Sequence, residues 1–65
     1  MKKIYSIKVI DSNMPNGYKY VYYKAITMHN AIYHMLVNDI ITDNEILAIR
    51  PVKRPHYKTS YVKEV

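Results

Sequence analysis

Residues 18–24 of this 65-residue chain read Tyr-Lys-Tyr-Val-Tyr-Tyr-Lys, which combines aromatic rings with positive charge. Tyrosine rings can stack on nucleic-acid bases, and lysine ammonium groups can pair with phosphates. On a β-strand successive side chains point to opposite faces. Tyr18, Tyr20, Tyr22 and Lys24 would then share one face. The segment therefore predicts an aromatic and basic surface on one side of a sheet.

A β-hairpin is expected to hold this surface. Residues 2–10 and 18–26 read as strands, and residues 11–17 (DSNMPNG) carry a dense turn signal. A symmetric closure pairs Ile10 with Tyr18, Lys8 with Tyr20, Ser6 with Tyr22 and Ile4 with Lys24. The opposite face is then uniformly apolar or aromatic, which supports this register because a one-residue slip would mix the two faces. That face carries Tyr5, Ile7, Val9, Val21, Tyr23 and Ala25.

An amphipathic helix is expected over about residues 28–38, with Thr27 as its N-cap. Its apolar side chains recur at helical spacing, at Met28, Ala31, Ile32, Met35 and Leu36. This stripe should cover the apolar face of the hairpin.

Residues 45–52 (EILAIRPV) favour a third strand because of their β-branched content and Pro51. Residues 42–45 also match a capping box, which would instead begin a short helix. With Leu47 and Ile49 facing the helix, the remaining strand residues join the tyrosine face. They are Ile46, Ala48, Arg50 and Val52.

These elements predict one small α+β domain over residues 1–52, in the order β-β-α-β, with one helix packed on one face of a three-stranded sheet. Residues 53–65 show no periodicity and are expected to form a flexible basic tail. A core of this size has only about 3–5 kcal/mol to spare. The chain has no cysteine, so neither a disulfide nor a thiolate metal site can supplement the core.

Charge is unevenly distributed along the chain, whose net charge is +5. Residues 27–49 contain no Lys or Arg, whereas residues 1–26 and 50–65 contain all the basic side chains. The second basic segment includes Arg50, Lys53 and Arg54. Such segregation suits a polyanionic partner, although a solvated basic tail often serves only solubility.

Catalytic and metal-binding patterns are weak. The single glycine excludes a Gly-rich phosphate loop, and no serine lies in a strand-turn-helix context. His29 and His34 are five residues apart rather than the four that chelate a metal on a helix, and His29 shares with Tyr33 and Val37 a flank expected to be packed. We therefore expect no enzyme, no metal, no cofactor and no small-molecule substrate.

The tyrosine face is too apolar to stay bare, so something should cover it. Nucleic acid could stack on the rings while basic side chains meet phosphates; a second copy or a foreign protein could pack on it; or the tail could fold back with Tyr57 and Tyr61. The sequence thus predicts a non-enzymatic binding protein, as a homodimer in the protein–protein reading. The expected partner-binding residues are Lys8, Tyr18, Tyr20, Tyr22, Lys24, Arg50, Lys53 and Arg54.

No apolar run approaches the roughly 18–20 residues that span a membrane, and no export signal is recognised, so a cytoplasmic location is expected. In size, charge and composition the chain resembles small accessory proteins of phages and mobile elements. That resemblance implies, as the alternative, a bacterial host protein that the chain inhibits or redirects.

Overall fold

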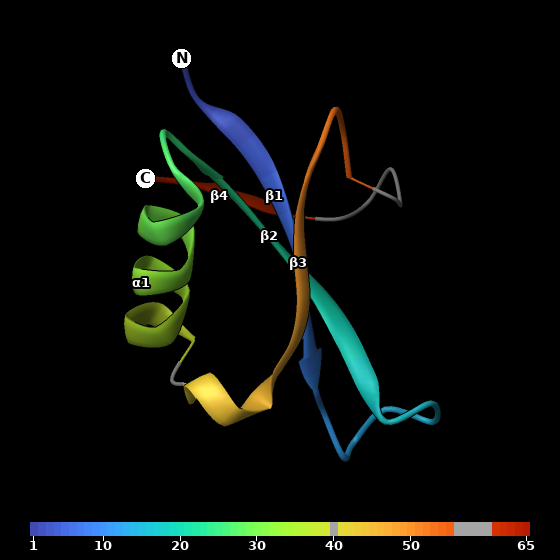
Figure 1. Cartoon of the computed structure of the whole chain (residues 1–65). Coiled ribbons are helices and arrows are strands. Elements are labelled where there is room, and N and C mark those ends of the chain that lie inside the picture. The colour runs from blue at the N-terminus through green and yellow to red at the C-terminus, as the bar shows by residue number, and fades with distance from the viewer. Residues whose placement is uncertain (40, 56–60) are drawn as a thin grey trace.

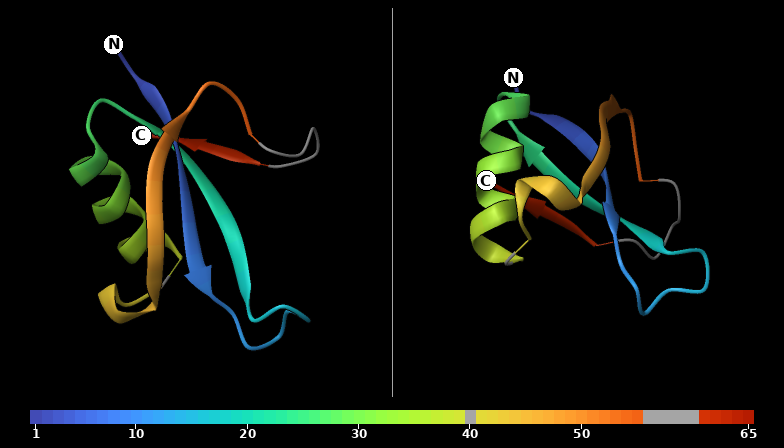
Figure 2. Two further views of the ribbon diagram at one scale, coloured as in Figure 1. Left: turned by 45° about the vertical axis from the view of Figure 1, so that its right-hand side comes forward. Right: turned by 60° about the horizontal axis from the view of Figure 1, so that its bottom comes forward.

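The computed structural model describes residues 1–39, 41–55 and 61–65. In chain order its elements are β1 (Lys3–Ile10), β2 (Tyr18–Ala25), α1 (Met28–Asn38), the 3₁₀ turn η1 (Asp43–Glu45), β3 (Ile46–Val52) and β4 (Val62–Glu64). The strands form one mixed sheet in the order β3-β1-β2-β4, and α1 lies on one side of it (Figure 1, Figure 2). The expected α+β class is confirmed.

The expectation of three strands is wrong, because a fourth strand forms inside the segment read as a tail. β4 runs parallel to β2, with Tyr22 opposite Val62 and Lys24 opposite Glu64. The Val65 N–H donates to the Lys24 carbonyl at 2.9 Å. Three residues are too few to show a strand period, and β4 is ordered by the open edge of β2 rather than by its own sequence. Tyr57 lies outside the described residues.

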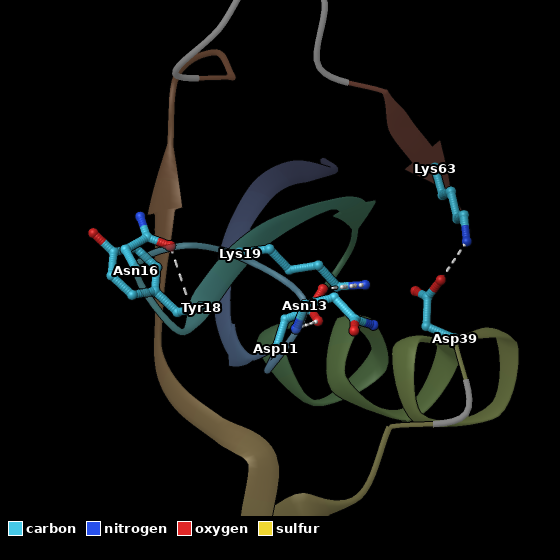
Figure 3. Close-up of polar contacts among 7 residues, drawn as sticks. All are labelled: Asp11, Asn13, Asn16, Tyr18, Lys19, Asp39 and Lys63. Carbon is cyan, nitrogen blue, oxygen red and sulfur yellow. Dashed lines mark hydrogen bonds and ion pairs between the residues drawn. The ribbon is translucent and has the colours of Figure 1, made fainter.

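The hairpin register is confirmed at every expected pair, from Ile10 opposite Tyr18 to Ile4 opposite Lys24. The turn closes with the Asp11 N–H donating to the Gly17 carbonyl at 2.9 Å. Gly17 adopts a φ of 83°, which glycine tolerates because it has no Cβ. Side chains reinforce the turn: Asp11 Oδ1 accepts from the Asn13 N–H at 3.0 Å (Figure 3).

The helix has the expected bounds, and Thr27 caps it by accepting a hydrogen bond from the Asn30 N–H at 3.1 Å. Its buried residues, Ala31 and Met35, pack against the predicted apolar face of the hairpin. The buried cluster comprises Tyr5, Ile7, Val9, Tyr23, Ala25, Ala31 and Met35. One side of the sheet is thus committed to the core.

The expected alternation along β3 is wrong at the start of the strand. Lys8 lies opposite Ala48, but Val9 lies opposite Ile46, so the register shifts between these two pairs. Such a bulge inserts one residue and reverses the facing of those beyond it. Ile46 therefore packs against the core, and Leu47 is 51% exposed. Upstream, Glu45 Oε1 accepts from the Thr42 N–H at 3.1 Å, so the capping box and the strand are both present.

Candidate binding surface

The side of the sheet that faces away from α1 is called here the outer face. Side chains directly opposite one another on paired strands share a face, so the strand registers align the outer face into rows. In the order of the sheet these rows are Val52, Ile4, Lys24 and Glu64; then Arg50, Ser6, Tyr22 and Val62; then Ala48, Lys8 and Tyr20; and finally Ile10 and Tyr18. Aromatic and basic side chains therefore share the outer face with small and apolar ones and with Glu64.

Lys8, Tyr18 and Tyr20 form one contiguous group on this face. The Lys8 ammonium nitrogen lies 4.0 Å from the centroid of the Tyr18 ring, a cation–π contact. The Tyr18 and Tyr20 rings meet edge to face, with centroids 5.7 Å apart and an interplanar angle of 87°. Each ring is thus held by a neighbour, which limits the orientations that a ligand would have to fix on binding.

Tyr20 lies where three shallow hollows meet. One of about 240 Å³ lies between Tyr20, Arg50 and Arg54, and a second of about 310 Å³ lies between Tyr20, Lys8 and Arg50. The third, of about 230 Å³, is lined by Tyr20 and Tyr61 and also by Tyr23, Asp39 and Lys63, which lie on the helix side of the sheet. Tyr20 is 42% exposed. An exposed ring flanked by cations on the same surface is suited to stacking against a planar group that carries negative charge nearby.

A basic hollow of about 520 Å³ lies at the end of the sheet near the N-terminus, lined by residues from both of its sides. The described residues that line it include four lysines and no acid; they are Lys2, Lys3, Ile4, Lys24, Pro51, Val52 and Lys53. Glu64 lies beside this hollow, where Lys2 Nζ donates to its Oε2 at 3.1 Å. That hydrogen bond, together with the charges of Lys2 and Lys24, lowers the pKa of Glu64.

Most of the expected partner-binding residues are accessible on this surface. Tyr20, Arg50, Lys53 and Arg54 are exposed, and Lys8, Tyr18 and Lys24 are partly buried. Tyr22 is the exception, since only 4% of it is exposed. It occupies the centre of the sheet, between β1 and the unanticipated β4. The partner-binding role expected of Tyr22 stays a prediction, on a side chain that is buried in this structure.

Tyr61 and Lys63 were not among the expected partner-binding residues. Tyr61 is 77% exposed, immediately before β4, and it lines a hollow together with Tyr20. The sequence offered Tyr61 only as part of a tail that could fold back over the tyrosine face, and it gave no register for that return.

Lys63 belongs to a polar cluster on the helix side of the sheet, with Tyr23 and Asp39. Asp39 Oδ1 accepts from Lys63 Nζ at 2.7 Å (Figure 3), and Asp39 Oδ2 accepts from the Tyr23 hydroxyl at 2.5 Å. Burial and then the contact with Asp39 raise the pKa of Tyr23. Burial alone would raise the pKa of Asp39, but the hydrogen bonds from Lys63 and Tyr23 outweigh it and lower that pKa. The cluster fastens β4 and the end of α1 to β2, which is a structural role.

The expectation of a packed helix flank is wrong. Tyr33 is 58% exposed and Val37 is 59% exposed, and His29 is exposed as well. Core residues come from the neighbouring stripe, so the flank is presented outward. The Tyr33 and His34 rings meet edge to face with centroids 5.3 Å apart.

Comparisons with protein-family models, with curated proteins and with solved structures find no match to this chain. Among the residues that the structure describes, no helix is long and apolar enough to cross a membrane. Within the same residues, no three His, Asp or Glu side chains are grouped so that they could hold a metal ion.

Proposed function

We propose that this protein binds single-stranded nucleic acid on the outer face of its sheet, without catalysis and in the cytoplasm. The observation that carries the proposal is the position of Tyr20, an exposed ring at the meeting point of three hollows with Lys8, Arg50 and Arg54 around it. Stacking on a ring and neutralising phosphates are the two contributions on which single-strand binders rely.

Each part of the surface has a defined role in this proposal. A base stacks on Tyr20, and a neighbouring base is within reach of Tyr61 across their shared hollow. Arg50 and Arg54 meet the phosphates beside Tyr20, and the four-lysine hollow extends the positive track toward the N-terminal end of the sheet. Tyr18 supports Tyr20 edge-on and holds Lys8 above its own ring.

Unpaired bases fit this surface better than a duplex does. A base within a duplex has both of its flat faces covered by stacked neighbours, whereas an unpaired base can present one to a side chain. The outer face from Ile4 to Ile10 is about 20 Å long, given the rise of a strand, so it can contact only a few nucleotides. Because stacking and phosphate contacts are insensitive to base identity, we expect little sequence preference.

Fluorescence anisotropy with a labelled single strand of about eight nucleotides tests this proposal. Tyr20→Ala should weaken binding by about 5- to 150-fold, which corresponds to the 1–3 kcal/mol of one stacked base. Tyr33→Ala is the matched control, because Tyr33 is also an exposed tyrosine but lies on α1, across the sheet. Absence of binding at about 50 mM salt, or equal losses in both variants, would contradict the proposal.

A host-protein partner is the second candidate function, and the exposed side chain of Leu47 on the edge strand β3 favours it. Open edges are sites where a partner strand can be added. Pro51 in the same strand has no N–H to offer, which limits such pairing to part of the edge. Capture of a host protein by the wild type and by Tyr20→Ala, but not by Leu47→Lys, would favour this candidate over nucleic acid.

A further inference from the structure

The four-lysine hollow at the end of the sheet gathers positive charge that the chain leaves largely unbalanced. Among the residues that the structure describes, only one of these lysines makes an ion pair, Lys2 with Glu64 at 3.1 Å. Glu64 thus offsets one of the four charges, and the hollow stays positive. Like charges held close together repel one another and oppose the folded state. An anion in the hollow would relieve this repulsion.

The strand registers place lysines on both flanks of an apolar floor. Ile4 of β1 lies opposite Lys24 on β2 and opposite Val52 on β3, so these three side chains form one row across the sheet. Lys53 directly follows Val52. The backbones of the two outer strands are about 10 Å apart, given the spacing of neighbouring strands. Flexible lysine side chains on either flank can therefore close on one small group held above Ile4.

A phosphate monoester suits this hollow better than a phosphate inside a nucleic-acid strand does. A monoester carries about 1.5 to 2 negative charges at neutral pH, and it has three free oxygens that accept hydrogen bonds. A phosphate between two nucleotides carries a single charge and offers only its non-bridging oxygens. A lysine ammonium donates in three directions and accepts in none. Several lysines can therefore share one monoester, which they hold more strongly than an internal phosphate.

We infer that the four-lysine hollow binds the terminal phosphate of the single strand that lies on the outer face. The inference rests on the proposed function, because the strand brings the phosphate to this end of the sheet. Tyr20 and Lys24 lie on the same face of β2, about 13 Å apart along the strand. That distance corresponds to about four nucleotides of a stacked strand. A strand with a base on Tyr20 can thus place its end in the hollow, whereas one nucleotide is too short to occupy both.

Recognition of a terminal phosphate would make the protein selective for cut strands. Hydrolysis of a phosphodiester leaves a phosphate on one of the two new ends and a hydroxyl on the other. Stacking and internal phosphates are common to both ends, so the outer face by itself does not distinguish them. The hollow adds a contact that only the phosphate end can make.

Fluorescence anisotropy tests the inference with three strands of about eight thymidines, labelled internally and ending in a 5′-phosphate, a 3′-phosphate or hydroxyls only. The quantity compared is the ratio of affinities for a phosphate-ended and the hydroxyl-ended strand. A surface ion pair contributes about two- to threefold, so several together should give the wild type a ratio of about ten for at least one end. Lys24→Gln and Lys53→Gln should each lower this ratio by about two- to threefold. Both variants should fold, because Lys53 is exposed and Lys24 is only partly buried.

Lys19→Gln is the matched control, because it removes the same charge at a lysine that pairs with Asp11 outside the hollow. Its ratio should equal that of the wild type. Thymidine monophosphate, added as a competitor, distinguishes a strand end from a free nucleotide. It should not displace the phosphate-ended strand at equal concentration, since it cannot occupy the hollow and Tyr20 together.

The possible failures of this inference and of the proposed function are distinguishable. Equal affinity of the wild type for all three strands, or a ratio that Lys24→Gln and Lys53→Gln leave unchanged, would overturn the terminal-phosphate site while nucleic-acid binding stands. Displacement by thymidine monophosphate at equal concentration would overturn the strand end as the ligand. Absence of binding to every strand at about 50 mM salt would contradict the proposed function, and this inference with it.

Discussion

The Tyr23 hydroxyl donates a hydrogen bond of 2.5 Å to Asp39, which links the middle of β2 to the residue that ends α1. Tyr23 is fully buried, and the same carboxylate accepts from Lys63 on β4. Three segments that are distant in the sequence therefore converge on one side chain. The cluster therefore ties the short β4 to β2 and to the end of α1.

Removing the hydroxyl should weaken the fold without opening a large cavity. We expect Tyr23→Phe to lower the free energy of unfolding by about 1–2 kcal/mol, because Asp39 loses a charge-assisted hydrogen bond while Lys63 remains. Urea denaturation measures the change. Tyr20→Phe is the matched control and should shift stability by less than about 0.5 kcal/mol, as surface changes usually do. Equal effects of the two substitutions would contradict the role given to Tyr23.

Stability should fall in acid, in part because of Asp39. The pKa of this carboxyl is lower in the folded chain than its ordinary value of 3.8. Its contribution is therefore present above about pH 4 and is lost as the pH falls through the lower folded pKa. Urea denaturation at a series of pH values measures how much the free energy of unfolding falls in acid. Asp39→Asn should reduce this fall, and Glu64→Gln should reduce it further, since Lys2 lowers the pKa of Glu64. If Asp39→Asn lost as much stability in acid as the wild type does, Asp39 would not stabilise the fold through this cluster.

Gly17 should resist substitution for a purely conformational reason. Its φ is 83°, and a Cβ added there would meet no atom within 4 Å. We expect Gly17→Ala to destabilise the chain by about 1–2 kcal/mol through backbone strain. Gly17→Asn should cost less, because asparagine tolerates positive φ. Thermal denaturation of both variants measures this difference, and a destabilisation by Asn equal to that by Ala would refute the explanation.

Nucleic-acid binding should depend on salt through particular side chains. For single strands, the logarithm of the binding constant falls linearly with the logarithm of the salt concentration, and each phosphate contact contributes about −0.7 to the slope. Arg50→Gln should therefore make the slope shallower by about 0.7. Lys19→Gln removes the same charge at a residue that pairs with Asp11 at 3.6 Å (Figure 3), on the helix side of the hairpin. Its slope should match that of the wild type, and an equal change in both variants would indicate a diffuse charge effect instead of an outer-face contact.

Local patterns predicted the hairpin and the helix well. The Asp11–Gly17 turn and the alternation of side chains in residues 2–10 and 18–26 leave one register that keeps a face apolar, and that register is present. Thr27 and the apolar stripe likewise predicted a helix over about residues 28–38, and α1 spans Met28–Asn38. In both cases the determining interactions lie within one strand, one turn or one helix, so the sequence contains them directly.

Contacts between distant segments decided the rest. A bulge opposite Lys8 and Val9 turned Ile46 inward and Leu47 outward, because the pairing of β3 with β1, and not its own alternation, sets its facing. The edge of β2 ordered β4, and Tyr22, which lies opposite Val62, is buried in the complete structure.

The sequence by itself determined that aromatic and basic side chains gather on one face of a hairpin, since strand periodicity and charge are properties of the chain alone. Only the tertiary structure decided which rings are accessible. Exposure depends on the neighbours that other segments supply, and these leave Tyr20 and Tyr61 open while they bury Tyr22.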